Sequence, residues 1–290
     1  MEKRVLHLKG LECSRIVAGA WRWNKVDHKT LELLIRTSLD TGITSFDHAD
    51  IYGDYGNEKS FGAVIKTRSS LRGSMQLITK CGIQLLSSKH PGNRVKHYDT
   101  SKTHIINSVD NSLSNLGTDY IDLLLIHRPD PLMDPEEVAD AFGLLKQNGK
   151  VLHFGVSNFS ATQFELLQSC LPFPLITNQL EISLRKTDLL FDGTVDVMMK
   201  HKASPMAWSP LGGGKLMSAE SKLWTKKEKY HATETQLSLA WLLRHPAGLF
   251  PVIGTTQPER ITESAHATNI LLDRQDWFEM LQIARGYEVP

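Results

Sequence analysis

The sequence predicts an α/β protein: a single-domain (β/α)8 TIM barrel over residues 1–290, with an N-terminal β-hairpin and a C-terminal helix. Three observations lead to this fold. Short β-rich runs alternate with longer segments of helical periodicity, which is the pattern of a parallel α/β fold. The β-rich runs are apolar almost throughout, as expected of strands covered on both faces. No linker rich in proline or serine divides the chain, so one domain is expected, with a doubly wound open sheet as the alternative.

The carboxyl ends of the expected strands are where functional side chains should gather. Parallel barrel strands all end at one rim, and that rim is where such barrels do their chemistry. In chain order the expected strands are Arg15–Ala20, Ile43–Asp47, Met75–Lys80, Ile121–His127, Leu152–Ser157, Leu175–Gln179, Pro205–Ser209 and Phe250–Ile253.

Helical periodicity fills the segments between these strands. Two helix starts carry capping signals: Asp134 precedes Pro135 and two glutamates, and Thr256 to Glu259 has the pattern of a capping box. The Val5–Leu11 stretch is expected to be part of a short hairpin that closes the bottom of the barrel. The expected helices are Lys29–Asp40, Asn57–Thr67, Thr103–Leu116, Asp134–Gln147, Ser160–Ser169, Leu189–Lys200, Thr233–Arg244, Gln257–Thr268 and a tail helix Asp273–Arg285.

Composition excludes several classes of function. The chain is 41% hydrophobic and 22% charged, with a net charge of +1 and no basic stripe, so neither nucleic acid nor an anionic membrane is an expected partner. No apolar run approaches the roughly 18 residues that span a bilayer. Three scattered cysteines form neither a disulfide framework nor a zinc motif. We expect a cytoplasmic protein without a metal, and a monomer by default.

Four polar residues lie at or just after strand ends in the first half of the chain: Asp47, Tyr52, Lys80 and His127. A free phenol has a pKa near 10, and an ammonium against its oxygen should lower that pKa. Lys80 can supply the ammonium, and Asp47 can keep Lys80 charged in a partly buried pocket. The ring of His127 can hold a carbonyl oxygen beside the phenol. The four residues therefore predict general-acid catalysis at an oxygen that becomes negative.

The same blocks carry a family resemblance. FDHADIYGDYGNE, LITKCG and LLLIHRPD resemble the three signature blocks of the aldo-keto reductase superfamily, and most nearly those of the bacterial YdhF-like oxidoreductases. The resemblance runs nearly end to end. It implies reduction of an aldehyde or ketone to an alcohol by hydride transfer from NADP(H), in preference to NAD(H), with Tyr52 as the acid. His48 stands where the superfamily commonly has a small residue.

The cofactor is expected across the barrel mouth, because no Gly-x-Gly-x-x-Gly fingerprint follows a strand. Trp208 can stack on a nicotinamide ring, the glycines after it let backbone approach a pyrophosphate, and Arg260 can fork onto a 2′-phosphate. Gly254 and Ser264 stand where many members have lysine and asparagine. The resemblance implies cofactor contacts from Gly19, Ala20, Trp21, Asp47, Tyr52, Ser157, Asn158, Gln179, Trp208, Ser209, Pro210, Leu211, Gly212, Gly214, Lys215, Gly254, Thr255, Thr256, Arg260, Glu263 and Ser264.

The substrate side is less specific. Trp21, Trp23 and His127 are expected to line the substrate pocket, although Trp23 is equally well explained as a core aromatic. The Gln84–Asp99 stretch is expected to be a loop over the site. Two other functions share part of this pattern. One is an NADP(H)-binding redox sensor of low turnover. The other is a metal-dependent hydrolase that would use His48, Asp50 and His127.

Overall fold

Eight parallel strands close into a barrel in the computed structural model, which describes residues 1, 3–8, 10–218 and 221–289. Each expected strand is present, which confirms the (β/α)8 barrel. Around the barrel the order is β10-β11-β12-β3-β4-β5-β8-β9, so chain neighbours pair throughout and the first barrel strand closes on the last. The strands are β3 (Val17–Gly19), β4 (Ser45–Asp47), β5 (Gln76–Cys81), β8 (Ile121–Ile126), β9 (Val151–Ser157), β10 (Leu175–Glu181), β11 (Met206–Trp208) and β12 (Phe250–Ile253).

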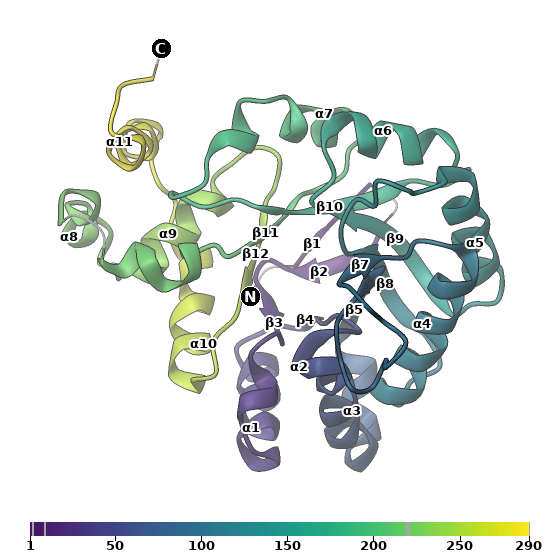
Figure 1. Ribbon diagram of the computed structural model, residues 1–290. Helices are drawn as coiled ribbons and strands as arrows, with labels where there is room; N and C mark the ends of the chain where they lie inside the picture. Colours follow the sequence, from purple (N-terminus) through teal and green to yellow (C-terminus); the bar gives the residue numbers. More distant parts are fainter. Residues whose placement is uncertain (2, 9, 219–220, 290) are drawn as a thin grey trace.

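Helices surround this ring of strands (Figure 1). Asp134 caps one of them as expected, since its Oδ1 accepts from the backbone N–H of Glu136 at 2.9 Å. The helices are α1 (His28–Asp40), α2 (Tyr52–Tyr55), α3 (Asn57–Thr67), α4 (Lys102–Leu116), α5 (Pro135–Gln147), α6 (Ala161–Ser169), α7 (Thr194–Lys200), α8 (Lys227–Tyr230), α9 (Glu234–Leu243), α10 (Pro258–Ala265) and α11 (Arg274–Arg285). Short 3-10 segments lie at Trp23–Lys25, Ser69–Ser74, Asp188–Leu190, Gly212–Ser218, Ser221–Trp224 and His266–Asn269.

Two helix predictions are wrong in detail. The helix expected from Leu189 begins only at Thr194, because Gly193 takes a left-handed conformation with a φ of 88° and interrupts the turn. The capping box expected from Thr256 is absent: Gln257 is the N-cap of α10, and no side chain caps that helix. The first N–H groups of α10 are therefore left without a side-chain acceptor, which is the condition for binding an anion there.

An antiparallel hairpin of β1 (Lys3–Val5) and β2 (Glu12–Ser14) precedes the barrel. The Val5–Leu11 stretch is mainly the connection between its strands, and Lys9 within it lies outside the described residues. Leu6 is fully buried in the cluster that fills the barrel interior, so the hairpin does plug one end of the barrel. That cluster comprises Leu6, Cys13, Val17, Ile78, Leu123, Leu125, Ile176, Met206, Phe250 and Val252.

The C-terminal helix α11 packs outside the barrel, as expected, against α9. Trp241 and Trp277 stack at 4.8 Å between ring centroids, and each indole N–H donates to the backbone carbonyl of the other residue, at 3.1 and 2.9 Å. These reciprocal bonds satisfy both indole donors, of which Trp241 is buried and Trp277 partly buried. The pair therefore joins the tail helix to the barrel wall.

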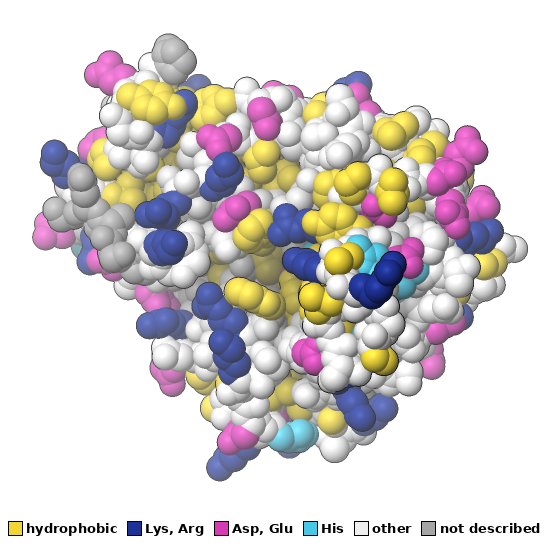
Figure 2. All heavy atoms as spheres, in the orientation of Figure 1, with side chains coloured by type: hydrophobic (Ala, Val, Ile, Leu, Met, Phe, Trp, Pro, Cys, Tyr) yellow, Lys and Arg dark blue, Asp and Glu magenta, His cyan; other side chains and the backbone are white. Residues whose placement is uncertain are grey.

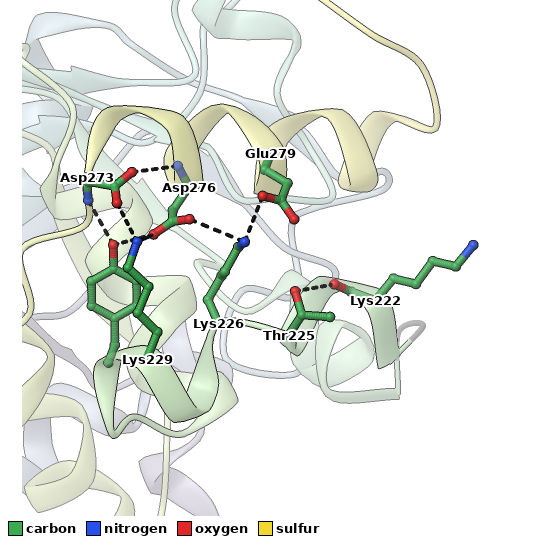
Figure 3. Close-up of polar contacts among 8 residues, drawn as sticks. Lys222, Thr225, Lys226, Lys229, Asp273, Asp276 and Glu279 are labelled. Atoms are coloured by element: carbon green, nitrogen blue, oxygen red, sulfur yellow. Dashed lines mark hydrogen bonds and ion pairs between the residues drawn. The ribbon is translucent and has the colours of Figure 1, made fainter.

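A network of ion pairs holds the short helix α8 on α11 (Figure 3). Lys229 Nζ donates to Asp273 and Asp276, both at 2.5 Å, and Tyr230 donates its hydroxyl to Asp276. Lys226 bridges Asp276 and Glu279 at 3.3 and 2.7 Å. Burial raises the pKa of Asp276, but the bonds from Lys229, Tyr230 and Lys226 outweigh it and the pKa is lowered. The network therefore holds the end of the segment between β11 and α9 against α11.

The described part of the chain contains no helix long and apolar enough to cross a membrane.

Candidate active site

The ammonium of Lys80 is the centre of a buried polar cluster at the carboxyl ends of β4 and β5. Lys80 Nζ donates to Asp47 Oδ2 at 2.8 Å, to the His48 carbonyl at 2.8 Å and to the Tyr52 hydroxyl at 3.1 Å. An ammonium has three donors, so these contacts satisfy Lys80 completely. The expected juxtaposition of a carboxylate, an ammonium and a phenol is thus present in the structure.

Asp47 is held from both sides of the barrel. Its second oxygen, Oδ1, accepts from Gln179 Nε2 on β10 at 2.9 Å. Asp47 is 2% exposed and Lys80 1%, so the pair lies in a low-dielectric region where neither charge is tolerated alone. Lys80 is therefore fixed in place by groups from several strands.

A strained turn directs Tyr52 toward Lys80. Gly53, Asp54 and Tyr55, the rest of α2, have φ values of 59°, 52° and 60°, although only glycine adopts this conformation without cost. A Cβ on Gly53 would lie 2.0 Å from Asn57 Oδ1. Asn57 in turn donates through Nδ2 to the Ala20 carbonyl after β3, at 2.8 Å. The backbone around Tyr52 is thus determined by contacts to two strand ends.

Burial changes the pKa of the phenol in the direction opposite to the expectation. Burial raises the pKa of Tyr52, and the charge and hydrogen bond of Lys80, which lower it, offset this only in part. Burial also lowers the pKa of Lys80, but the Asp47 charge outweighs it, so the Lys80 pKa is raised. Tyr52 is therefore a protonated phenol at neutral pH, held against a permanent cation that stabilises the phenolate once the proton leaves.

His127 completes the group from β8. Its ring lies edge-on to the Tyr52 ring, with centroids 5.8 Å apart, and the residue is 8% exposed. Burial and the charges of Lys80, Arg128 and Lys96 lower the pKa of His127 well below its ordinary value. The imidazole is thus neutral, which leaves one ring N–H to donate to an oxygen placed beside the phenol.

A second pair of carboxyls lies near Lys80, with Asp50 partly buried and Glu58 buried, and sequence reasoning considered Asp50 only as a metal ligand. Asp50 Oδ2 accepts from Ser108 at 2.8 Å and Oδ1 from the Ile51 N–H at 2.7 Å, while Glu58 accepts from Thr79 at 2.6 Å. Burial, followed by the Glu58 charge, raises the pKa of Asp50 to about 8. Burial also raises the pKa of Glu58. Asp50 is thus a poor source of negative charge at neutral pH.

Asp50→Asn is expected to flatten the pH dependence of stability. The folded state keeps the Asp50 proton up to about pH 8, whereas the unfolded chain loses it near pH 4. The free energy of unfolding of the wild type therefore falls as pH rises through this window. Asparagine can accept from the Ile51 N–H through its oxygen and donate to Ser108 Oγ through its amide nitrogen, without this loss. The variant should therefore be more stable than wild type at pH 9, by about 1–3 kcal/mol. Urea unfolding of both proteins at pH 6, 7.5 and 9 measures the difference. The prediction would be contradicted if the two free energies of unfolding changed with pH by the same amount.

His48 is fully buried with neither ring nitrogen bonded, and burial lowers its pKa to about 3. Its ring contacts Phe61 edge-on at 4.4 Å. The hydrolase alternative needed His48, Asp50 and His127 to converge on a metal. Among the described residues no three His, Cys, Asp or Glu side chains form such a group.

The ends of β9, β10 and β11 carry four of the predicted cofactor contacts, Ser157, Asn158, Gln179 and Trp208, joined in a chain of hydrogen bonds. Asn158 Nδ2 donates to Ser157 Oγ at 2.7 Å, and Ser157 donates to the Gln179 carbonyl at 2.9 Å. Trp208 Nε1 donates to Asn158 Oδ1 at 2.9 Å. These bonds orient the indole of Trp208 at the barrel mouth.

A cavity of about 300 Å³ opens beside the glycine turn after β11. Ser209 and Gly212 to Gly214 all have positive φ there, so the backbone is open to close approach. Two basic residues after β10, Arg185 and Lys186, also line it and were not predicted. A basic pair after a strand end was the signal that could have identified them. The cavity is lined by Glu181, Ser183, Arg185, Lys186, Ser209, Gly212, Gly213 and Lys215.

The predicted phosphate site after β12 is open at Gly254 and Arg260, which are exposed. Ser264 donates to the Arg260 carbonyl at 2.7 Å, and Glu263 accepts from Thr233 on α9 at 2.5 Å. Ser264 and Glu263 thus already have partners within the protein, whereas the guanidinium of Arg260 forms no hydrogen bond or ion pair with any described residue. Thr255 and Thr256 are partly exposed next to these residues.

The tryptophans after β3 have opposite environments. Trp21 is 61% exposed, whereas Trp23 is 3% exposed, contacts Phe46 and Phe61, and donates to the Thr255 carbonyl at 2.9 Å. This geometry favours the packing explanation for Trp23 and leaves Trp21 available to a ligand. Pro210 and Leu211 are buried and partly buried behind the glycine turn.

The Gln84–Asp99 stretch lies against the turn that carries Tyr52. It is a small hairpin of β6 (Ile83–Gln84) and β7 (His97–Tyr98) with a long connection. Tyr55 accepts from the Leu85 N–H at 2.9 Å, and Lys89 donates to the Asp54 carbonyl at 2.5 Å. This hairpin therefore forms one side of the barrel mouth.

Comparison with known proteins agrees with the geometry. The sequence model of the Aldo/keto reductase family matches residues 15–285 of this chain. Oxidoreductase YdhF of Escherichia coli is 47% identical over 97% of each chain. The uncharacterized oxidoreductase YcsN of Bacillus subtilis is 45% identical over 99% of this chain and 100% of its own. The 6-dehydroglucose reductase of Agrobacterium fabrum is 46% identical over 96% of this chain and 97% of its own.

A solved structure has the same fold. The thermostable aldo-keto reductase Tm1743, crystallised with the inhibitor epalrestat, superposes with a TM-score of 0.83 at 25% identity, over 98% of this chain and 100% of that one.

Proposed function

The chain belongs to the aldo/keto reductase family, and from this premise we propose that it is an NADP(H)-dependent oxidoreductase that reduces an aldehyde or ketone to an alcohol. The observation that carries the proposal is the Lys80 ammonium bonded at once to Asp47 and to the Tyr52 hydroxyl, with a neutral His127 beside them. We further propose a small-molecule carbonyl compound as substrate and a cytoplasmic, monomeric protein.

The residues present fit a nicotinamide dinucleotide. The indole of Trp208 is oriented at the mouth, the cavity after β11 is lined by three cations, and no side chain caps α10. We propose that Ser157, Asn158 and Trp208 hold the nicotinamide, and that the turn from Ser209 to Lys215 holds the pyrophosphate. The start of α10 with Arg260 would hold the phosphate of the adenosine. When bound, NADPH supplies the hydride.

The protein's own residues then act on the substrate oxygen. The His127 N–H and the Tyr52 hydroxyl bind the carbonyl oxygen and direct the carbon toward the hydride source. As hydride adds to carbon, the π electrons move to oxygen, and that oxygen takes the Tyr52 proton. Lys80 stabilises the resulting phenolate, and Asp47 keeps Lys80 charged. The products are an alcohol and NADP⁺, and Tyr52 is reprotonated from solvent.

The proposal is tested by the loss of NADPH absorbance with a panel of aldehydes and ketones. Turnover that persists in a metal chelator supports it. The name 6-dehydroglucose reductase, carried by relatives 46% and 37% identical to this chain, supports the inclusion of hydroxylated aldehydes in the panel. Clear NADPH binding without turnover of any substrate would instead favour the redox-sensor alternative.

Arg260→Ala is expected to weaken NADPH binding about tenfold and to leave NADH binding nearly unchanged. A hydrogen bond to a charged group contributes about 1.5–3 kcal/mol, and the exposed position of Arg260 places the effect at the lower end. Fluorescence titration with both nucleotides measures the difference. Arg274→Ala, an exposed arginine at the start of α11, is the matched control. Equal weakening of both nucleotides would show that Arg260 does not bind the 2′-phosphate.

A further inference from the structure

Arg128 is a half-buried cation at the barrel mouth that has no anionic partner. It follows His127 directly at the end of β8, and its guanidinium lies over the Trp208 ring, 5.4 Å from the centroid. It forms no hydrogen bond or ion pair with any described residue. Arg72, in contrast, is paired with Asp122 at 2.8 Å. The five N–H donors of the Arg128 guanidinium thus have no partner among the described residues and are available to a ligand.

The charge of Arg128 reaches the catalytic groups. Its charge offsets part of the burial effect that raises the pKa of Tyr52. Together with the charge of Lys96 on the β6–β7 hairpin, it also contributes to the lowered pKa of His127. No described carboxylate forms an ion pair with Arg128 or Lys96, and Asp47 is bonded to Lys80 and Gln179.

Asp130, two residues after Arg128, already has partners of its own. Asp130 accepts from Thr100 and from the Leu132 N–H. Asp50, whose pKa is raised to about 8, favours its neutral form at pH 7, and burial raises the pKa of Glu58. Arg128 and Lys96 therefore place positive charge without an ion-pair partner among the described residues at the mouth, although the whole chain carries a net charge of only +1. Figure 2 shows this face, where Lys and Arg side chains gather around a hollow with an apolar floor.

We propose that Arg128, assisted by Lys96, binds an anionic group of the substrate, so that the preferred substrate is an aldehyde that carries a carboxylate or a phosphate. This inference rests on the proposed function and names the substrate class of the same site. A guanidinium can bind either anion with two parallel hydrogen bonds, which also sets the orientation of the bound molecule. Because Arg128 is adjacent to His127, the anion and the carbonyl are separated by a short spacer.

The test compares matched aldehydes that differ in charge. The carboxylate pair is 4-oxobutanoate and butanal, and the phosphate pair is glyceraldehyde 3-phosphate and glyceraldehyde. The wild type is expected to have the higher kcat/KM for the charged member of at least one pair. In Arg128→Ala that preference should fall about 10- to 100-fold, mainly through KM, because a charge-assisted contact is lost. The pair that shows the larger fall identifies carboxylate or phosphate as the group.

Three further variants sharpen the result. Arg128→Lys should recover part of the preference, since it restores charge without the planar fork. Lys96→Ala should lower the preference less than Arg128→Ala, because Lys96 is exposed. Arg36→Ala, an exposed arginine on α1, is the control and should leave both pairs unchanged.

Two results would overturn the inference while the proposed function stands. One is NADPH-dependent reduction in which Arg128→Ala lowers kcat/KM equally for charged and neutral aldehydes. The other is a weaker NADPH affinity in Arg128→Ala with the charge preference intact, which would assign the guanidinium to the cofactor. Absence of NADPH-dependent turnover with every aldehyde would instead refute the proposed function, and the inference with it.

Discussion

Tyr52→Phe is expected to lower kcat for carbonyl reduction by about 100- to 10,000-fold, the range that general-acid catalysis contributes. The ring keeps its place in the left-handed turn, so NADPH should still bind. What is lost is the proton and one of the three acceptors of the Lys80 ammonium. The measurement is steady-state NADPH oxidation together with an NADPH binding titration.

Tyr120→Phe is the matched control for this change. Tyr120 precedes β8, so it lies at the end of the barrel opposite the Tyr52 site, and its ring contacts the Arg72 guanidinium at 4.0 Å. The same loss of a hydroxyl should leave kcat unchanged there. Turnover that survives in Tyr52→Phe would remove Tyr52 from the role of acid and leave the other three residues to be reassigned.

Lys80→Met is expected to abolish turnover and to destabilise the protein. The substitution leaves Asp47 buried with only Gln179 as a partner, and an uncompensated buried carboxylate costs about 3–5 kcal/mol. The unfolding transition in urea should move to lower concentration by a corresponding amount.

The double variant Asp47→Asn with Lys80→Met separates stability from catalysis. Removing the second charge abolishes the penalty, because the asparagine can still accept from Gln179. Most of the lost stability should therefore return, while turnover should not. A double variant as unstable as Lys80→Met would show that packing of the lysine stem, not its charge, is what the site requires.

The sequence predicted the barrel well because the signals for it are local. Apolar runs such as Ile121–Ile126 can only be strands covered on both faces, and the Asp134 cap determines a helix start by itself. Errors occurred where the local signal was ambiguous. Gly193 ended a periodic segment that otherwise favoured a longer helix, and Gln257 took the cap position that the Thr256 pattern predicted for its neighbour.

The candidate site was predictable to the extent that strand ends determine it. Asp47, Lys80 and His127 each end an apolar run, and parallel strands bring such ends to one rim. Asp50 and Glu58 lie in the same sequence block as Tyr52, yet their raised pKa values depend on burial against α4 and β5, which no spacing reveals. Arg128 was overlooked for the same reason, since nothing in the sequence distinguishes an arginine after a histidine from a solvated surface residue.

By itself, the sequence determined which residues reach the barrel rim and in what order. Local apolar patterns determine where each strand ends and how strands alternate with helices. Only the tertiary structure decided their electrostatic state. The pKa of the Tyr52 phenol is raised, not lowered, because the effect of burial outweighs that of the Lys80 charge. Arg128 lacks an anionic partner because no carboxylate among the described residues lies within ion-pair distance of its guanidinium. Both outcomes depend on solvent exclusion and on distances between strands far apart in sequence, which exist only once the barrel closes.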